Sequence, residues 1–584
     1  MNGFLGDISV SAPFVVGGEP QYVEGDLRVF FRGWISNRAS VLERCGAFPS
    51  PADDAELACR AYRRWGRDLQ RHVEGEFALV IVDKASGGVL LTQDGIGVCA
   101  LFVGVLAGRL VFTSHLHHLL ETGYPLVLDE MYLAEHLRFC RHIGDHSPFR
   151  DIQRMTGGQT LEWRNGALKP HAAWSLAEVR PAGVGAVDEL DEQFRALLAD
   201  AVTSATTGER CWTELSGGLD SSSIACCAAS IGIPVEAVSL TYPDSPSADE
   251  RPWMRKVVER WPMPWRQIDA DALTPFSKWP DAPFGEPNMS ICTFAHSEAL
   301  HRMAAEGGAT ALLSGNGGDH ALLGDRVTPV FLADALLGGR FGALNTAIAQ
   351  WRAAGAPTRS WRFMMAEAAV RPAIDSLFGR TIRPGQSLPA PSWLHPDLVR
   401  RHRLTEPSRG SGGLKDRTVG GQHYRERIRE ASILLSMNVN QYRAAVPMRY
   451  PLLHRPLVAF MYGLPWEEKL RPGQDRVIQR RALKDILPSA VRRRVTKAGI
   501  EEPCMKGLKA GGARLVAELT EGSRLVHHGL VDQSSWTRTV GLATRGMVEG
   551  LSLFMAAASL EIWLRQTEAA VSLQPKGSGG RGGV

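Results

Sequence analysis

Residues 216–222 read Ser-Gly-Gly-Leu-Asp-Ser-Ser and combine glycines, hydroxyls and one carboxylate in a short segment, which we call loop one. An apolar run that predicts a strand precedes loop one, and an Ala/Cys-rich run that predicts a helix follows it. A turn of this kind leaves unpaired backbone N–H groups at the helix N-terminus, where the helix dipole favours a phosphate. The expected nucleotide and pyrophosphate ligands are Ser216, Gly217, Gly218, Leu219, Asp220, Ser221 and Ser222.

Asp220 is the unusual member of loop one. A carboxylate beside a phosphate site repels the ligand unless a cation lies between them, so we interpret Asp220 as a Mg²⁺ ligand. The segment lacks the Gly-Lys-Ser/Thr of a Walker A loop. The alternative interpretation is a serine-rich helix cap, but the position between a strand and a helix favours the phosphate site.

The elements around loop one predict an α/β protein. Up to about residue 175 the chain is typical of β-structure, with strand pairs expected in residues 77–95 and 100–114 and a helix in residues 54–66. After a Gly/Pro-rich linker, strands and helices alternate, which predicts a doubly wound parallel sheet. The expected strands are residues 210–215, 235–242 and 310–315, and the expected helices are residues 187–202, 220–232, 250–261 and 297–308.

The last part of the chain, from about residue 330 to 565, is predicted to be mostly helical. Two polar stretches broken by Gly and Pro, residues 383–393 and 406–417, are candidates for lids or plain loops. The Gly-rich end, residues 571–584, is expected to be a disordered tail.

Composition excludes several classes of protein. The 66 basic and 62 acidic side chains nearly balance, which argues against a dedicated nucleic-acid-binding protein. Nine cysteines without a C-x-x-C pair argue against a disulfide framework or a zinc ribbon. No apolar run reaches about 18 residues and no export signal is evident, so we expect a cytoplasmic protein without a membrane span.

Loop one resembles the pyrophosphate loop of the ATP-pyrophosphatase enzymes, which cleave ATP to AMP and pyrophosphate. Residues 311–325 narrow the resemblance to the asparagine synthetase family, whose second loop has the pattern Ser-Gly-x-Gly-x-Asp. Here Asp319 is present, whereas His320 replaces the usual Glu. The resemblance implies ATP and Mg²⁺ as cofactors, with Asp220 and Asp319 sharing the metal. It also implies phosphate contacts from Ser314, Gly315 and Gly317.

Three further segments are similar to this family. Residues 238–244 match its second strand, where backbone near Ser239 and Leu240 would meet adenine. Residues 449–465 are similar to its Arg-x-Pro-x-Leu-Asp segment, with His454 in place of Asp. Residues 478–503 are similar to its closing motif, which implies that Lys497 neutralises the phosphates in the transition state. The expected catalytic residues are Asp220, Asp319 and Lys497.

The N-terminal segments 31–44, 72–83 and 90–104 resemble the glutaminase domain of asparagine synthetase, an N-terminal-nucleophile fold. In a working glutaminase a Cys follows the initiator Met, but here the second residue is Asn2, and an amide cannot act as the nucleophile. The Arg-rich segment that would bind glutamine's α-carboxylate is also missing. We therefore expect the domain to be a scaffold that releases no ammonia.

The resemblance implies an N-terminal α+β sandwich domain followed by a doubly wound parallel-sheet ATP-pyrophosphatase domain with a large helical C-terminal part. The expected boundaries are residues 1–176 for the degenerate glutaminase-like domain, 177–187 for the linker, 188–570 for the synthetase domain and 571–584 for the tail.

A synthetase that makes no ammonia needs another amine. Two branches of the family fit: one closes a β-lactam ring in a small amino-acid derivative, and the other, the lasso-peptide macrolactam synthetases, joins a peptide's N-terminal amine to an Asp or Glu side chain. Insertions around residues 325–425 favour the peptide branch. That branch is further favoured by many aromatic and basic groups in or near those insertions, namely Trp351, Trp361, Phe363, Trp393, Arg400, Arg401 and Arg403.

The residue at the family's general-base position also favours the peptide branch. Pro447 stands where the family has a glutamate, and an α-amine with a pKa near 8 needs less help from a base than an amide nitrogen does. Glu430 and Tyr442 are alternative bases. If the peptide branch is correct, the partners are a linear core peptide, a leader-recognition protein and a leader protease, and residues 406–417 are a candidate lid.

Three alternatives remain: a β-lactam synthetase, an ammonia-dependent asparagine synthetase and a non-catalytic scaffold that binds a peptide or an enzyme. The retained Asp220, Asp319 and Lys497 weigh against a scaffold.

Overall fold

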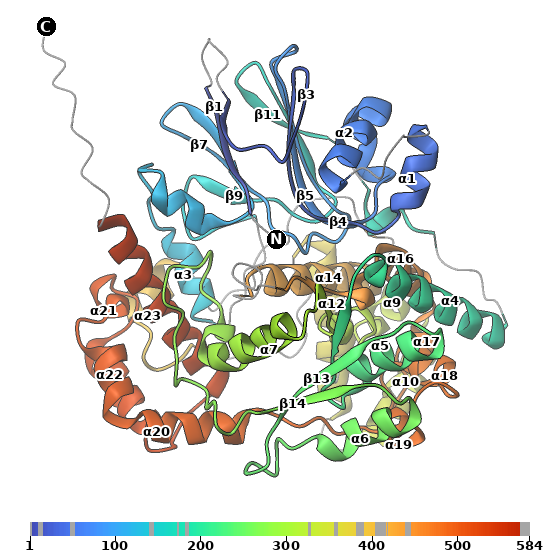
Figure 1. The fold of residues 1–584 in the computed structure, drawn as a ribbon. Coiled ribbons are helices and arrows are strands. Elements are labelled where there is room, and N and C mark those ends of the chain that lie inside the picture. The colour runs from blue at the N-terminus through green and yellow to red at the C-terminus, as the bar shows by residue number, and fades with distance from the viewer. Residues whose placement is uncertain are drawn as a thin grey trace, which may run out of the picture.

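The computed structural model describes residues 3–9, 16–46, 53–138, 145–171, 174–180, 186–324, 329–355, 360–380, 390–402, 404, 416, 418–438 and 446–572. Figure 1 shows the N-terminal strands, which form two sheets, above a larger body of helices that contains the third sheet. Asn2, Arg403, Tyr442 and most of the two Gly/Pro-broken stretches lie outside the described residues.

The N-terminal part contains two antiparallel sheets, with strand orders β2-β1-β8-β7-β9 and β11-β10-β6-β5-β4-β3. The expected strand pairs form β5 with β6 and β7 with β8, and the expected helix is α2. The element bounds are β1 Leu5–Ser9, β2 Val16–Gly18, β3 Tyr22–Glu24, β4 Leu27–Ile35, α1 Arg38–Cys45, α2 Asp54–Trp65, β5 Gly75–Asp83, β6 Gly88–Gln93, β7 Phe102–Leu106, β8 Arg109–Thr113, α3 Glu130–His136, β9 Ile152–Arg154, β10 Thr160–Arg164 and β11 Ala167–His171.

Strand β5 has no polar face because it lies between two apolar layers. Ala78, Val80 and Val82 pack in the core shared with the other sheet, whereas Leu79 and Ile81 pack in the core shared with α2. The two-residue side-chain alternation of a strand thus fills both cores of a sandwich.

The third sheet is parallel and has the order β14-β13-β12-β15-β16. The strands expected at residues 210–215, 235–242 and 310–315 are β12, β13 and β15, and each of the four expected helices is present. The bounds are α4 Val187–Thr206, β12 Cys211–Glu214, α5 Leu219–Ser230, β13 Glu236–Thr241, α6 Arg251–Arg260, β14 Trp265–Asp269, α7 Phe294–Glu306, β15 Ala311–Leu313 and β16 Met448–Arg449.

Helices dominate the described residues from 330 onward, as predicted. The short helix α8, Gly318–Ala321, precedes this region. The helices within it are α9 Leu332–Leu337, α10 Phe341–Gly355, α11 Trp361–Met365, α12 Arg371–Leu377, α13 Pro396–Arg401, α14 Val419–Ser436, α16 Arg455–Gly463, α17 Trp466–Lys469, α18 Val477–Ala482, α19 Ser489–Arg493, α20 Glu501–Thr520, α21 Arg524–His527, α22 Gln533–Ala543 and α23 Leu551–Ser572. Helix α23 extends two residues into the segment expected to be a tail, and the rest of that segment lies outside the described residues.

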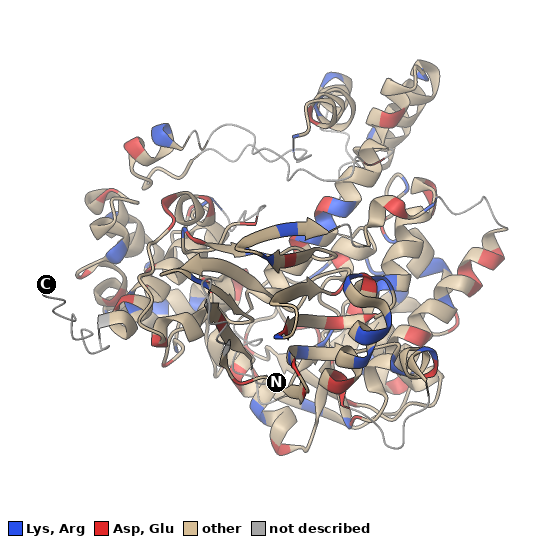
Figure 2. Cartoon of the chain, turned by 90° about the horizontal axis from the view of Figure 1, so that it is seen from above, with Lys and Arg blue, Asp and Glu red and all other residues tan. Residues whose placement is uncertain are grey.

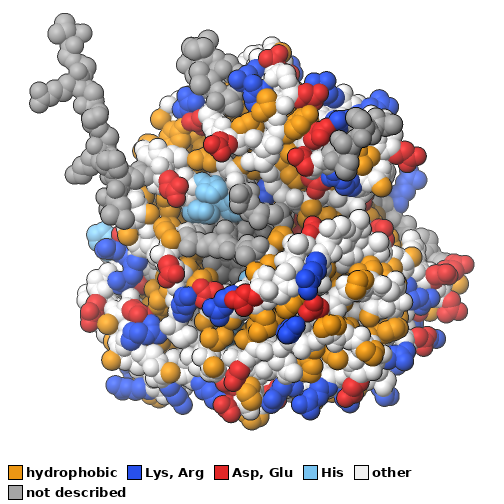
Figure 3. Space-filling view, viewed as in Figure 1, with side chains coloured by type: hydrophobic (Ala, Val, Ile, Leu, Met, Phe, Trp, Pro, Cys, Tyr) orange, Lys and Arg blue, Asp and Glu red, His pale blue; other side chains and the backbone are white. Residues whose placement is uncertain are grey.

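Among the described helices, none combines the length and the apolarity that crossing a membrane requires. Acidic and basic residues are scattered over the helices and strands in Figure 2, and both kinds are interspersed on the face seen in Figure 3.

Buried polar contacts join the N-terminal layer to the helical body. Arg154 of β9 forms an ion pair with Glu286, which is fully buried and also accepts a 2.9 Å hydrogen bond from the Tyr132 hydroxyl. Glu76 of β5 accepts a 2.8 Å hydrogen bond from the backbone N–H of Tyr450. Because each contact leaves a buried polar group unpaired if one partner is removed, the two parts are held in one arrangement.

Candidate active site

Loop one is held in shape by its own serines. The backbone N–H of Ser216 donates to Ser221 Oγ at 3.1 Å, the two hydroxyls lie 2.9 Å apart, and Gly218 N donates to Ser216 Oγ at 3.3 Å. Gly217 has a φ of 74°, and an added Cβ would lie 2.8 Å from a side chain of α6, so this position requires glycine. Helix α5 begins directly after Gly218 without a side-chain cap, as an anion site requires.

Residues 314–319, which we call loop two, pack directly against the first turn of α5. A Cβ added at Gly315 would lie 2.6 Å from Ser221 N, and one added at Gly318 would lie 2.5 Å from Asp220 Cγ. Gly317 has the left-handed conformation, with a φ of 89°. The glycines of loop two therefore bring its backbone against loop one, and Asp319 then lies beside Asp220.

Both carboxylates contact one nitrogen of Arg476. Arg476 Nη2 lies 2.8 Å from Asp220 Oδ2 and forms a second ion pair with Asp319. Arg476 itself adopts the left-handed backbone conformation, with φ 50° and ψ 44°, which is costly for a residue other than glycine. Gly324 leaves room for the guanidinium, because an added Cβ would lie 2.4 Å from Arg476 Cζ.

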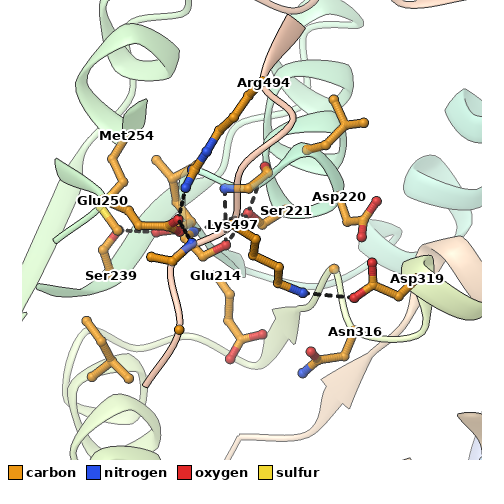
Figure 4. A pocket seen from close by; sticks show the side chains of 18 of the residues that line it. Glu214, Asp220, Ser221, Ser239, Glu250, Met254, Asn316, Asp319, Arg494 and Lys497 are labelled. Atoms are coloured by element: carbon orange, nitrogen blue, oxygen red, sulfur yellow. Dashed lines mark hydrogen bonds and ion pairs between the residues drawn. The ribbon is translucent and has the colours of Figure 1, made fainter. Parts of the chain in front are cut away.

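The electrostatics of the two carboxylates differ. Burial raises the pKa of Asp220, with Arg476 acting in the opposite direction. Burial also acts against ionisation of Asp319, but Arg476 and Lys497 outweigh it and hold the pKa of Asp319 below its usual value. Lys497 Nζ lies 2.8 Å from Asp319 Oδ2 (Figure 4), and that carboxylate raises the pKa of Lys497 against the effect of burial. Asp319 is therefore ionised and surrounded by cations at neutral pH.

The donor set fits a shared Mg²⁺ ion. One nitrogen atom contacts oxygens of both carboxylates, so one cation at that position can be held by both. Among the described residues, no group of three or more His, Cys, Asp or Glu side chains could hold a metal, so the protein would supply only the two carboxylates. Phosphate oxygens and water would complete the shell, which is the usual arrangement for Mg²⁺.

The segment that carries Lys497 is fixed to the end of the sheet by Glu250. Arg494 forms an ion pair with Glu250 and donates to Gly217 O at 3.2 Å, and Ala498 N donates to Glu250 Oε1 at 3.0 Å. The carboxylate thus holds residues 494–498 across loop one, as Figure 4 shows. The sequence offered no signal for Glu250 or Arg494, since their roles depend on contacts between distant segments.

A cavity of about 900 Å³ lies where these segments meet. Its lining includes Asp220, Asp319, Lys497 and most of the predicted phosphate ligands, with Ser239 and Leu240 at the end of β13. The predicted residues outside the lining are Gly217, Ser222 and Ser314.

Several sequence-based expectations fall outside this cavity. Pro447 lies next to β15, where its carbonyl accepts the N–H of Leu312, and His454 lies 3.2 Å from Asp200. Glu430 is exposed on α14 and does not line the cavity, so it is poorly placed as a base. The described members of the aromatic and basic set also lie elsewhere: Trp393 is buried in the core against Trp536.

Sequence reasoning missed a further carboxyl group in the cavity, that of Glu214. Glu214 ends β12 and points into the cavity, on the same side as Asn316 and Lys497 in Figure 4. Burial raises its pKa, and a hydrogen bond with Ser314 acts in the opposite direction. A glutamate after "CWT" gives no signal by itself, because its position depends on the parallel sheet.

Two family profiles match this chain. The family profile described as asparagine synthase matches residues 193–565, and the one described as a glutamine amidotransferase domain matches residues 17–174. The chain is 27% identical over 305 residues to carboxyethyl-arginine beta-lactam-synthase of Streptomyces clavuligerus, covering 50% of this chain and 55% of that protein. It is 25% identical over 226 residues to glutamine-hydrolyzing asparagine synthetase 3 of Bacillus subtilis, covering 35% and 36%.

A provisionally named glutamine-hydrolyzing asparagine synthetase 2 of Methanocaldococcus jannaschii is 24% identical over 321 residues, or 51% of this chain and 59% of that protein. The chain thus spans less than two thirds of the length of these relatives. A solved glutamine phosphoribosylpyrophosphate amidotransferase from B. subtilis has 13% identity and a TM-score of 0.21, covering 50% of this chain and 71% of that one. Since the asparagine synthase profile covers more than half of the 584 residues, the chain belongs to the asparagine synthase family, whose members are ATP-dependent ligases that form amide bonds.

Proposed function

We propose that this protein activates a carboxylate with ATP, releases pyrophosphate, and transfers the acyl group from AMP to an amine. The observation that carries the proposal is that a single cavity contains loop one, loop two and Lys497. The loop N–H groups and serine hydroxyls would bind the phosphates, and the Lys497 ammonium would stabilise negative charge on the departing pyrophosphate. Mg²⁺ bound by Asp220 and Asp319 would supply further positive charge to that leaving group.

We further propose that the substrate is a linear core peptide, in which an Asp or Glu side chain is adenylated and the N-terminal amine attacks to close a macrolactam. Support comes from helices α9–α12, which hold many of the exposed large hydrophobic side chains, as expected of a surface that contacts a peptide or protein. These are Leu337, Phe341, Trp361, Phe363, Val370, Ile374, Leu377 and Phe378. A leader-recognition protein and a leader protease in the cytoplasm would then supply the peptide.

A second candidate is closure of a small ring. The similarity to a carboxyethyl-arginine beta-lactam-synthase favours it, as does the location of the described aromatic and basic set outside the cavity. The similarity to asparagine synthetases likewise keeps amidation of aspartate as a third candidate. In all three, we propose that residues 1–176 act as a scaffold and residues 188–570 perform the chemistry.

One experiment separates the candidates. The purified full-length protein is incubated with ATP, MgCl₂ and one probe at a time: linear peptides with a free α-amine and one Asp or Glu at successive positions, carboxyethyl-arginine, or L-aspartate with ammonium chloride. AMP is quantified and products are weighed by intact mass. L-Glutamine in place of ammonium tests the scaffold proposal, which predicts no glutamate release.

A peptide product lighter by one water, formed together with AMP and resistant to aminopeptidase, is the expected result. Turnover of carboxyethyl-arginine or aspartate alone would overturn the peptide proposal and retain the ligase. The variant Asp319→Asn should form no AMP with any probe, because the shared cation site loses one charged ligand. AMP formation by that variant at the wild-type rate would overturn the metal assignment.

A further inference from the structure

The parallel sheet has two faces, and Glu214 can be assigned to one of them. Side chains alternate along β12, so Trp212 and Glu214 lie on the same face. Trp212 is buried against the end of α7, since a Cβ added at Gly307 would lie 2.2 Å from its ring. Glu214 therefore also lies on the α7 side of the sheet, next to the cavity wall formed by Leu300 of α7 and by α14.

The wall beside Glu214 is apolar. It consists of Leu300 and of Ala431, Leu434 and Leu435 on α14, all of which line the cavity. The predicted nucleotide and phosphate contacts, by contrast, come from loop one, from Gly315 and Gly317 of loop two, and from Ser239 and Leu240 at the end of β13. The part near Glu214 is thus left for the acyl group and the attacking amine.

Other charged groups in the cavity are already paired. Asp475 forms an ion pair with Arg480, and Glu250 with Arg494. The remaining charged lining residues lie at the phosphate end, and α7 and α14 contribute none of the described ones. They are Asp220, Asp319, His320, Arg476 and Lys497. Tyr242, which directly follows β13, also lines the cavity, but burial raises its pKa to about 12 and keeps it protonated at neutral pH.

We propose that Glu214 is the general base that accepts a proton from the attacking amine nitrogen. The neutral amine attacks the acyl carbon, a C–N bond forms, and the C–O bond to AMP breaks with its electron pair leaving on AMP. One proton passes from the nitrogen to the Glu214 carboxylate and then to water. This inference rests on the proposed ligase function and gives that function the base that Pro447 cannot supply.

The protein environment suits this role. Burial favours the neutral carboxyl, which brings the pKa of Glu214 up toward that of an amine and makes proton transfer between them easier. The opposite charges of a carboxylate and an ammonium also favour binding of the amine in an apolar setting.

The test compares wild type with Glu214→Gln, Glu214→Asp and the control Glu236→Gln, whose side chain lies at the opposite end of the neighbouring strand, paired with Arg210. Each uses the probe that wild type turns over in the experiment above. ATP–pyrophosphate exchange reports acyl-adenylate formation, and amide product reports the second step. Hydroxylamine then replaces the amine, because it is neutral at pH 7 and needs no base.

We expect Glu214→Gln to catalyse exchange and to form hydroxamate, but to lose about 100-fold or more of amide formation at pH 7. Its remaining amide rate should rise with pH up to the amine pKa near 8, because only the free amine then reacts. Glu214→Asp should recover part of the loss, and Glu236→Gln should match wild type.

Two results would overturn the inference while leaving the ligase intact: an unchanged amide rate and pH profile in Glu214→Gln, or equal losses with amine and hydroxylamine. A wild type that shows neither exchange nor AMP release with any probe would overturn the proposed function itself, and the base assignment with it. A melting temperature for each variant excludes misfolding as the cause of a loss.

Discussion

At the scale of single residues, the strongest feature is the arginine between the two carboxylates. Arg476 contacts both Asp220 and Asp319 with one nitrogen and reaches them from a strained left-handed backbone. Conformations of this kind persist where the surroundings enforce them and are concentrated at functional sites. The guanidinium neutralises the carboxylates where Mg²⁺ is expected to bind, so the two cations compete for one position.

This competition predicts the behaviour of Arg476→Met. Without the guanidinium, the facing carboxylates repel each other, and a divalent cation relieves more repulsion than it does in wild type. Titration with MgCl₂ in the absence of nucleotide should therefore raise the melting temperature of Arg476→Met more than that of wild type. Arg481→Met is the control, since Arg481 pairs with Asp191 and Glu468 outside the cavity. Equal Mg²⁺ responses in all three proteins would contradict the shared position.

At the scale of elements, helices α14 and α17 hold loop two against its neighbours. Lys469 of α17 is buried between the rings of Trp466 and Tyr424, at 4.9 and 5.1 Å from their centroids. The Tyr424 hydroxyl donates at 2.7 Å to Ala321 O, at the end of the helix that carries Asp319. The packing of α17 on α14 therefore supports the position of Asp319, the proposed metal ligand.

The buried lysine gives this packing a pH dependence. Burial lowers the pKa of Lys469 from 10.5 to about 7, so the unfolded chain binds more protons than the folded one between those values. The contribution of Lys469 to stability thus increases as pH rises from 7 to 10.5. Lys469→Met removes the burial cost, and it should raise the melting temperature more at pH 7 than at pH 10. The exposed Lys484→Met should show no such difference, and a constant gain for Lys469→Met at both pH values would refute the assignment.

The helices and strands also show which parts of the fold and the site could be predicted from the sequence. Loop one, loop two and Lys497 were predictable because each is a local pattern in a recognisable context. Strand β14 was missed because it is a half-exposed edge strand, and β16 because it has two residues. Arg476, Glu250 and Glu214 acquire their roles from partners more than 30 residues away or from the sheet, so no local pattern identifies them.

At the scale of the whole molecule, the contact between the two layers includes a buried acid. Burial raises the pKa of Glu76 from 4.5 to about 7, while the hydrogen bond from Tyr450 N acts the other way. Between pH 4.5 and 7 the folded protein therefore binds more protons than the unfolded chain. The stability contributed at this position falls as pH rises through that window.

Replacing Glu76 by Gln tests the sign of this effect. Gln retains an oxygen that can accept the Tyr450 N–H but has no charge to bury, so the gain in free energy of unfolding should approach about 3 kcal/mol above pH 7. The difference in melting temperature between Glu76→Gln and wild type should grow from pH 5 to pH 8. Glu43→Gln, on the exposed face of α1, is the control. A difference that shrinks over this range would show that Glu76 is stabilised as the anion.

The buried ion pair between Arg154 and Glu286 predicts that a fragment without the N-terminal layer is less stable than the full chain. A fragment that begins after the N-terminal layer would keep Glu286 but lose both Arg154 and Tyr132, its cation and its hydrogen-bond donor. Breaking a buried pair in this way typically costs about 3–5 kcal/mol, a large part of the stability of a domain. We therefore expect the rest of the chain to need residues 1–176 for its stability, for a reason unrelated to glutamine: Arg154 neutralises a buried acid that would otherwise lose its cation.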